Sequence, residues 1–328
     1  MTQVTVLGAS GYLGSAVSRL LLTRSCRVRL VSRTSPHRTV RSSEHREDID
    51  LCRIDLRQPG AVEYAVRDSD LVICLVADLE SRHAWRREED PDAESVDLGV
   101  LERVIECSVP RSVLFASTAA LSNPGADEAR TPYELCKQRA ERALLDATKH
   151  GVVRGVSLRF PSLVGVPQGA SEPGMGAVRV FAERALSGQT IDLWASGDIR
   201  RNLLHVDDAA SAVLAAVRHV DRIAGDNWDV GAAKGTPLAE IAELVADAAA
   251  RITGQPPTPV VRVAPPTTAA AHDLTDGKLE VARFQAATNW TPRRSAATAI
   301  NETVAALANT LGIATDTRSA TPAGKDIG

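Results

Sequence analysis

The sequence lacks the features that would suit it to a metal, a membrane or nucleic acid. Its five cysteines are odd in number and, like its seven histidines, show no metal-ligand spacing, so we expect free thiols and no metal. No apolar run approaches the roughly 18 residues of a membrane span, and no apolar leader precedes the first strand pattern. A net charge of −3 provides no strong field for nucleic acid or an anionic membrane. We therefore expect a cytoplasmic protein that binds neither.

Aromatic residues are also scarce, at 3%, so Ala, Val and Leu must fill most of the core. Apolar runs alternate with helical patterns in the first half, which is typical of a parallel sheet covered on both faces. The predicted strands there are Val4–Leu7, Arg27–Val31, Leu71–Ala77, Ser112–Ala116 and Gly155–Phe160. The longer predicted helices are Leu98–Cys107, Tyr133–His150, Ala177–Leu186, Asp207–Val220 and Leu238–Ile252.

This pattern predicts an α/β fold, with a Rossmann-type doubly wound parallel sheet and a smaller C-terminal substrate-binding lobe. Residues 1–160 would form the dinucleotide-binding core, with further strands and helices from about 190–235. Residues 161–312 would form mainly the lobe, interleaved with the core. Residues 313–328 are small and polar, and we expect a disordered tail there.

A glycine-rich turn stands between the first predicted strand and the helix after it. Glycine there allows a tight turn, close approach of the backbone to a pyrophosphate, and close packing of helix on strand. An ordinary glycine-rich turn is the alternative, but the strand before and the helix after favour a dinucleotide site. The predicted cofactor contacts in this turn are Gly8, Ser10, Gly11, Tyr12, Leu13 and Gly14.

The end of the second predicted strand indicates the type of cofactor. A carboxylate at this place would hold the ribose of NAD, whereas an arginine accommodates the 2′-phosphate of NADP. The chain has Ser32-Arg33, followed by His37 and Arg38, and no acid before Glu44. We therefore predict NADP, the alternative being a solvated basic loop. After the next short strand, Asp55-Leu56 suits a contact with the adenine amino group, or a simple cap.

Tyr133 and Lys137 are four residues apart, which places them on one face of a predicted helix. The ordinary pKa of a phenol is about 10, and a nearby ammonium group would lower it towards neutrality. Ser117-Thr118 ends the preceding predicted strand and offers a hydroxyl for a substrate carbonyl. We predict that Thr118, Tyr133 and Lys137 form the catalytic centre, although such a pair on a surface helix can also arise by chance.

Several motifs, spread over residues 3–308, carry a resemblance to a known family. They are the glycine pattern, Ala116-Ser-Thr118-Ala, the Tyr133/Lys137 pair, Leu158-Arg-Phe-Pro161, Gly174-Met-Gly176, Arg201-Asn-Leu-Leu-His205-Val-Asp-Asp208 and Trp290-Thr-Pro292. Together they resemble the extended short-chain dehydrogenase/reductase family, or NAD-dependent epimerase/dehydratase family. Within it, the chain is most similar to NDP-hexose 4-ketoreductases, which finish the deoxysugars of antibiotics.

The resemblance implies hydride transfer from NADPH to the C4 ketone of a dTDP-4-keto-deoxyhexose. Tyr133 would donate the proton, Lys137 would bind the nicotinamide ribose, and Thr118 would hold the carbonyl oxygen. Further cofactor contacts are implied for Val76, Ala77, Ala116 and Pro161, and substrate contacts for Ser162, Arg201 and His205.

Two of these positions also have structural interpretations. Arg201 matches an arginine that grips the sugar-nucleotide diphosphate, but it could instead pair with a neighbouring carboxylate. For His205 we prefer a structural histidine bonded to backbone.

Four other functions are weighed against this one. A dehydratase needs carboxylates directly after the threonine, and Ala119 and Ala120 stand there. A sugar-nucleotide epimerase would hold NAD, which the basic strand end disfavours. A reductase of a non-sugar ketone stays open, because fold alone does not name the substrate. An NADP-sensing regulator would typically lose the Tyr133/Lys137 pair, which this chain keeps.

We also expect a homodimer, from the resemblance and from apolar positions on two predicted helices. Once one face of each helix meets the sheet, Leu101, Val104, Ala140 and Leu144 are left to form an interface.

Overall fold

The computed structural model describes residues 2–34, 47–77, 96–107, 110–122, 130–168, 170, 173–194, 197–265 and 275–313. Most of the basic segment after the second strand, including His37, Arg38 and Glu44, lies outside these ranges. So does the predicted tail, apart from Ile313. None of the helices within these ranges is long and apolar enough to cross a membrane.

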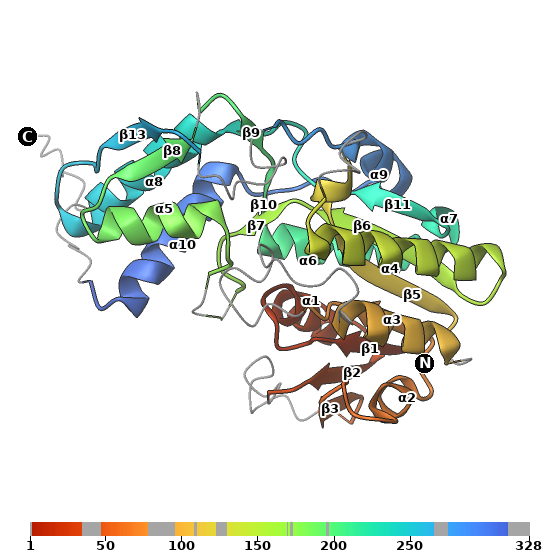
Figure 1. The fold of residues 1–328 in the computed structure, drawn as a ribbon. Helices are drawn as coiled ribbons and strands as arrows, with labels where there is room; N and C mark the ends of the chain where they lie inside the picture. Colours follow the sequence, from red (N-terminus) through yellow and green to blue (C-terminus); the bar gives the residue numbers. More distant parts are fainter. Residues whose placement is uncertain are drawn as a thin grey trace, which may run out of the picture.

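A seven-stranded parallel sheet forms the centre of the protein, which confirms the predicted fold class (Figure 1). Its strands lie in the order β11-β6-β5-β4-β1-β2-β3. The order reverses between β1 and β4, and cofactors bind at such a reversal, outside the carboxyl ends of the strands. The strands are β1 (Gln3–Leu7), β2 (Arg27–Ser32), β3 (Ile49–Arg53), β4 (Leu71–Cys74), β5 (Ser112–Thr118), β6 (Arg154–Phe160) and β11 (Asp226–Asp229).

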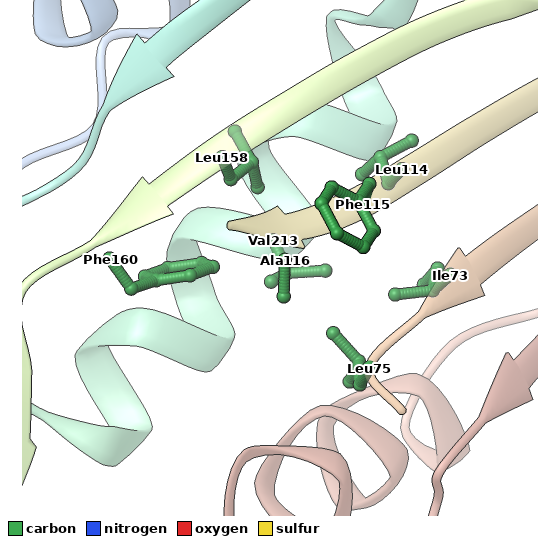
Figure 2. A pocket seen from close by; sticks show the side chains of 8 residues that line it. All are labelled: Ile73, Leu75, Leu114, Phe115, Ala116, Leu158, Phe160 and Val213. Carbon is green, nitrogen blue, oxygen red and sulfur yellow. The ribbon is translucent and has the colours of Figure 1, made fainter. Parts of the chain in front are cut away.

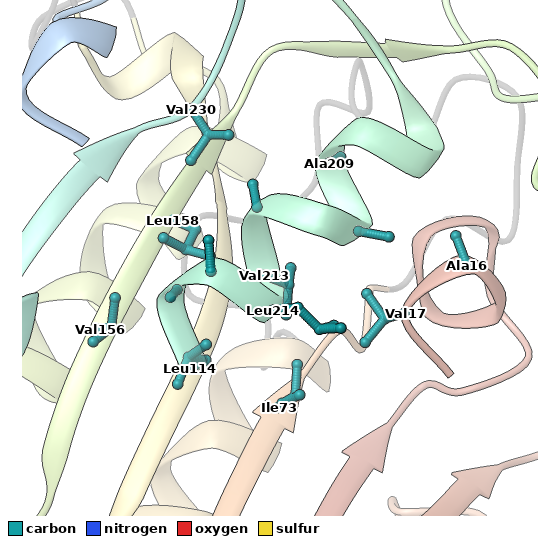
Figure 3. Packing of buried hydrophobic residues seen from close by; sticks show 14 of the residues in the cluster. Ala16, Val17, Ile73, Leu114, Val156, Leu158, Ala209, Val213, Leu214 and Val230 are labelled. Carbon is teal, nitrogen blue, oxygen red and sulfur yellow. The ribbon is translucent and has the colours of Figure 1, made fainter. Parts of the chain in front are cut away.

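Helices cover both faces of this sheet. On one face, α1 (Tyr12–Leu22) packs against α6 (Val206–Arg218), where Val17 meets Val213 and Leu214 above the sheet (Figure 3). The other face carries α2 (Ala61–Val66), α3 (Val96–Glu106) and α4 (Pro132–Lys149). Small and branched aliphatic side chains fill both layers. An aromatic cluster of Trp228, Phe284 and Trp290 closes the edge near β11, with α7 (Val220–Ile223) and α9 (Val281–Thr288) beside it.

A smaller lobe lies beside the main sheet (Figure 1). It has its own hydrophobic core. Three helices, α5 (Ala177–Leu186), α8 (Leu238–Thr253) and α10 (Ala296–Thr310), pack on one another. Of these, α5 and α8 also contact the parallel pair of β8 (Ile191–Trp194) and β13 (Val260–Val263). Short pairs connect it to the sheet: β7 (Ser162–Val164) with β10 (Leu203–His205), and β9 (Arg200–Arg201) with β12 (Thr236–Pro237). Of the described segments between 190 and 235, β11 joins the main sheet and α6 packs on it, whereas β8 belongs to the lobe.

Two predicted elements are shorter in the structure. The strand expected over Leu71–Ala77 ends at Cys74, because its neighbour β1 ends at Leu7 and gives it no further partner on that side. The helix expected over Asp207–Val220 ends at Arg218, and α7 follows it as a separate short helix.

The four apolar positions predicted to form a subunit interface are not available for one. Leu101, Val104, Ala140 and Leu144 are all fully buried within one subunit, in the core between α3, α4 and the sheet. Sequence spacing overlooked that α3 and α4 pack on each other as well as on the sheet, so each helix buries a wider face.

Candidate active site

The glycine turn after β1 is shaped by close backbone packing. Gly8 has a φ of 85°, and a side chain there would stand 2.8 Å from the carbonyl oxygen of Leu75. A Cβ on Gly14 would lie 2.0 Å from the carbonyl oxygen of Gly8, too close for any other residue. No side chain caps α1 at Gly11, so its first-turn amides keep their partial positive charge for an anion. The turn therefore fits a dinucleotide pyrophosphate.

Tyr12 links this turn to the segment that follows β7. Its hydroxyl donates to the carbonyl oxygen of Gly165 at 2.7 Å, and its ring packs against Gly174. Burial is the main cause that raises the pKa of this phenol above its ordinary value. Leu13, the next residue, packs against the core below. These contacts hold the turn in place from both sides.

Two arginines lie at the carboxyl ends of β2 and β3. Arg33 is exposed, and its carbonyl oxygen accepts from Nε of Arg53 at 3.2 Å. Ser32, predicted as a cofactor contact, is buried and donates its hydroxyl to the carbonyl oxygen of Thr34. Thr34 in turn shares a 2.9 Å hydrogen bond with Ser10 of the glycine turn. The strand end is therefore basic and tied to the glycine turn.

Asp55, predicted to contact adenine, is held by Arg57 at 2.7 Å. Hydrogen bonds from Arg57 lower the pKa of this carboxyl to about 2. The Leu56 side chain is buried, and its carbonyl oxygen accepts from Arg103 of α3. These contacts fix the loop after β3.

The helix that carries Tyr133 begins in a well-defined way. The Thr131 hydroxyl caps α4 by accepting from the amide of Glu134, and the Glu134 carboxylate in turn accepts from the amide of Thr131. Pro132 occupies the first helical turn. The cap fixes where the helix starts, and so places Tyr133 and Lys137 on one face at the end of β5, whose last residue is Thr118.

Lys137 is almost fully buried and makes two strong contacts. Its ammonium lies 2.8 Å from the Asp97 carboxylate of α3 and donates to the carbonyl oxygen of Ala116 at 2.9 Å. It lies 4.6 Å from the ring centre of Phe115 and 5.8 Å from that of Tyr133. The side chains of Lys137 and Asp97 are only 3% and 6% exposed, so this ion pair sits in a low-dielectric environment.

Asp97 was missed from the sequence, although a signal exists. It occupies the same face of α3 as Val100, Leu101 and Val104, and it is a carboxylate among residues that pack on the core. An acid at such a position must have a buried partner.

The expected lowering of the phenol pKa is not what the structure shows. Burial raises the pKa of Tyr133 above its ordinary value, and Asp97 and Glu134 add to this effect. Lys137 acts in the opposite direction but does not outweigh burial, and its ammonium is paired with the Asp97 carboxylate. This direction favours the neutral phenol over the phenolate.

Thr118, the predicted partner of the substrate carbonyl, is half-buried where β5 meets a short 3₁₀ helix, η3 (Ala119–Ser122). Its hydroxyl accepts from the amide of Ala120 at 3.3 Å and can still donate. Val76 and Ala77 follow the end of β4, the neighbouring strand. Pro161 follows β6, on the other side of β5. The sheet thus brings these predicted residues to one edge.

An apolar recess lies just below this edge, between the strands and α6 (Figure 2). Leu75, Ala116, Phe160 and Val213 line it together with Ile73, Leu114, Phe115 and Leu158. It has no room for a water molecule, and its side chains are all apolar. This edge of the sheet therefore rests on tightly packed apolar side chains.

The predicted substrate residues lie where the lobe joins the sheet. Arg201, on β9, donates to the carbonyl oxygen of Thr275 at 2.8 Å, and Ser162 is exposed on β7. His205 is buried at the end of β10. One of its ring nitrogens accepts from the amide of Asp207, so His205 caps the start of α6. The other ring nitrogen lies 2.7 Å from the Glu302 carboxylate. Both ring nitrogens of His205 are thus engaged within the protein.

Comparison with known proteins agrees with this arrangement. Residues 4–231 match the family model described as the NAD dependent epimerase/dehydratase family. The chain belongs to this family. The match covers β1, the glycine turn, the Tyr133/Lys137 helix and all seven strands of the main sheet.

Individual members of the family are similar only at low identity. A dTDP-L-rhamnose 4-epimerase of Burkholderia thailandensis is 21% identical over 295 residues, covering 74% of this chain and 80% of its own length. The structure of UDP-glucose 4-epimerase from Thermotoga maritima with UDP-glucose shares 22% identity, with a TM-score of 0.73, and covers 94% of this chain and 100% of its own. UDP-glucuronic acid 4-epimerase from Bacillus cereus, in complex with UDP-glucuronic acid and NAD, shares 16% identity at a TM-score of 0.73 with the same coverage. At such identities the structures establish the fold of this family member, and its substrate is a separate question.

Proposed function

We propose that this protein uses NADPH to reduce the C4 ketone of a dTDP-4-keto-deoxyhexose. The observation that carries the proposal is the half-buried Tyr133, one helical turn from the buried Lys137 ammonium. The pKa of this phenol is raised above its ordinary value, which favours the neutral form. Both lie at the sheet edge that also bears the glycine turn. A neutral phenol can give its proton to a ketone oxygen as hydride reaches the carbon.

The residues around the glycine turn support a bound NADP cofactor, which supplies the hydride. Gly8, Gly11 and Gly14 would let the pyrophosphate approach the start of α1. Lys137 uses two donors for Asp97 and Ala116, and its third N–H would donate to a ribose hydroxyl. Arg33 and Arg53 would bind the 2′-phosphate, as guanidinium groups suit a phosphate.

The rest of the proposed site spans the sheet edge and the lobe. Thr118 would donate to the ketone oxygen, beside the Tyr133 phenol. Arg201 would bind the diphosphate of the sugar nucleotide, and the lobe, mainly residues 161–312, would enclose the sugar. A homodimer is proposed on the family resemblance alone. Elimination of water is disfavoured, because Ala119 and Ala120 of η3 carry no group that transfers a proton.

A nucleotide-sugar C4 epimerase is the second candidate, favoured by the names of the relatives described above. Such an enzyme oxidises a C4 alcohol, turns the ketone over and reduces it again on one bound cofactor. It therefore needs Tyr133 as a base first and as an acid later. A phenol that burial keeps protonated suits the second half of that cycle better than the first.

A single set of incubations separates the two candidates. The purified protein is given a panel of dTDP-4-keto sugars with NADPH or NADH, and in parallel the 4-hydroxy sugar nucleotides with NAD. Cofactor consumption and product stereochemistry are measured by absorbance and NMR. We expect NADPH to be consumed in equal amount with the 4-hydroxy product. Interconversion of 4-hydroxy sugar nucleotides without net cofactor consumption, and no turnover of the keto sugars, would establish the epimerase instead.

A further inference from the structure

Asp97 of α3 faces the catalytic lysine and has no part in the proposed reaction so far. Its carboxylate contacts Lys137 at 2.8 Å, across the interface between α3 and α4. The pair is 40 residues apart in the chain and nearly inaccessible to solvent. A buried carboxylate in contact with a cation that faces Tyr133 must influence how that phenol behaves.

We propose that Asp97 is a positioning residue that fixes the Lys137 ammonium and cancels its charge, so that Tyr133 enters the reaction as a proton donor. This inference rests on the proposed function, because proton donation is what reduction of a ketone requires. With Lys137 unbalanced, the phenolate would be favoured, and a phenolate takes the proton from an alcohol in the reverse direction. Asp97 therefore biases the site towards reduction.

The groups around the pair leave Asp97 as the main control. From α4, Glu134 also raises the pKa of Tyr133, but its carboxylate is bound in the helix cap. From β4, Cys74 faces Lys137, and burial raises the pKa of that thiol to about 12, so it is neutral. From β5, Phe115 and the carbonyl of Ala116 contact the ammonium without carrying a charge. Asp97 is thus the carboxylate in direct contact with Lys137 among the described residues.

The chain makes a direct test possible, because it has only three tyrosines. Protein labelled with ¹³C at the tyrosine ζ carbon is titrated by NMR without cofactor or substrate, and Tyr133→Phe identifies the resonance. In the wild type, Tyr133 should not ionise below its ordinary pKa of about 10. In Asp97→Asn, its pKa should fall by at least about one unit, as a nearby unpaired cation requires.

Two control variants separate this effect from a loss of packing. Asp97→Glu keeps the carboxylate charge, and the pKa of Tyr133 in this variant should be closer to the wild-type value than it is in Asp97→Asn. Glu141→Gln removes another buried carboxylate from α4, one turn beyond Lys137. In the wild type, the Glu141 carboxylate pairs with Arg159 at 2.6 Å. The Glu141→Gln variant should reduce thermal stability but leave the Tyr133 resonance titrating as in the wild type.

The same variants give a kinetic readout. If Asp97→Asn reduces the keto sugar, the fall of its reduction rate at high pH should begin at least about one pH unit earlier than in the wild type. An unchanged Tyr133 titration in folded Asp97→Asn, or an equal shift in Glu141→Gln, would overturn the inference. If Asp97→Asn does not fold, Asp97→Glu and the wild type still decide, because a wild-type Tyr133 that ionises well below pH about 10 contradicts it. If none of the keto sugars is reduced but Tyr133 titrates as expected, the proposed function is refuted and the role of Asp97 at Lys137 stands.

Discussion

Replacing Lys137 by methionine should destabilise the protein far more than a surface change would. Methionine fills similar space but removes the Lys137 ammonium from the buried Asp97 carboxylate. At 2.8 Å and an effective dielectric constant of about 20, the gross attraction lost is about 6 kcal/mol. Breaking a buried pair by removing one partner typically costs about 3–5 kcal/mol, because the remaining charge is left uncompensated in the interior.

The double variant Asp97→Asn/Lys137→Met tests where this cost comes from. It removes the buried charge altogether and should recover at least half of the stability that the single variant loses. Both are measured by urea unfolding, followed by circular dichroism, with the wild type and Asp97→Asn completing the cycle.

The pH dependence gives a further check with a definite sign. In Lys137→Met the pKa of Asp97 should rise above its unfolded value of about 3.9, because burial is no longer opposed by a cation. The destabilisation relative to the wild type should therefore shrink as the pH falls towards that raised pKa. A single variant that loses less than about 1 kcal/mol, or a double variant no more stable than the single, would refute the description of a buried, mutually dependent pair.

Three other expectations concern the reaction and its cofactor. Tyr133→Phe should lower the ketone reduction rate by at least ~10²-fold, while the NADPH affinity measured by fluorescence titration changes little. Near-normal turnover would show that Tyr133 is not the proton donor. Arg33→Asp should weaken NADPH binding roughly ten- to a hundredfold and bring NADH use closer to parity, since a charge-assisted hydrogen bond is worth about 1.5–3 kcal/mol. Steady-state rates with both cofactors measure this preference, and an unaltered ratio speaks against a 2′-phosphate contact. Gly14→Ala should abolish NADPH binding in a protein whose circular dichroism shows a folded chain, because the new Cβ would meet the Gly8 carbonyl oxygen at 2.0 Å; wild-type affinity would contradict the packing of this turn.

Local sequence patterns determined the parts of this protein that depend on neighbours along the chain. The apolar runs predicted five of the seven strands of the main sheet, because a parallel strand buried on both faces needs continuous apolar residues. The four-residue spacing of Tyr133 and Lys137 placed them on one face of α4, because a helix brings residues i and i+4 together. The glycine turn was also visible, since its conformation and close packing exclude other residues.

Tertiary structure decided what depends on contacts between distant segments. Asp97 meets Lys137 only because α3 packs on α4, and that contact, with burial, decides whether Tyr133 is neutral or ionised. The same packing buries Leu101 and Ala140, which the helical periodicity of each segment alone had left for a partner subunit. His205 reaches Glu302 across 97 residues in the same way. Periodicity reports which face of an element is apolar, but how much of that face is covered, and which charges meet there, is determined by the neighbouring elements that the fold brings against it.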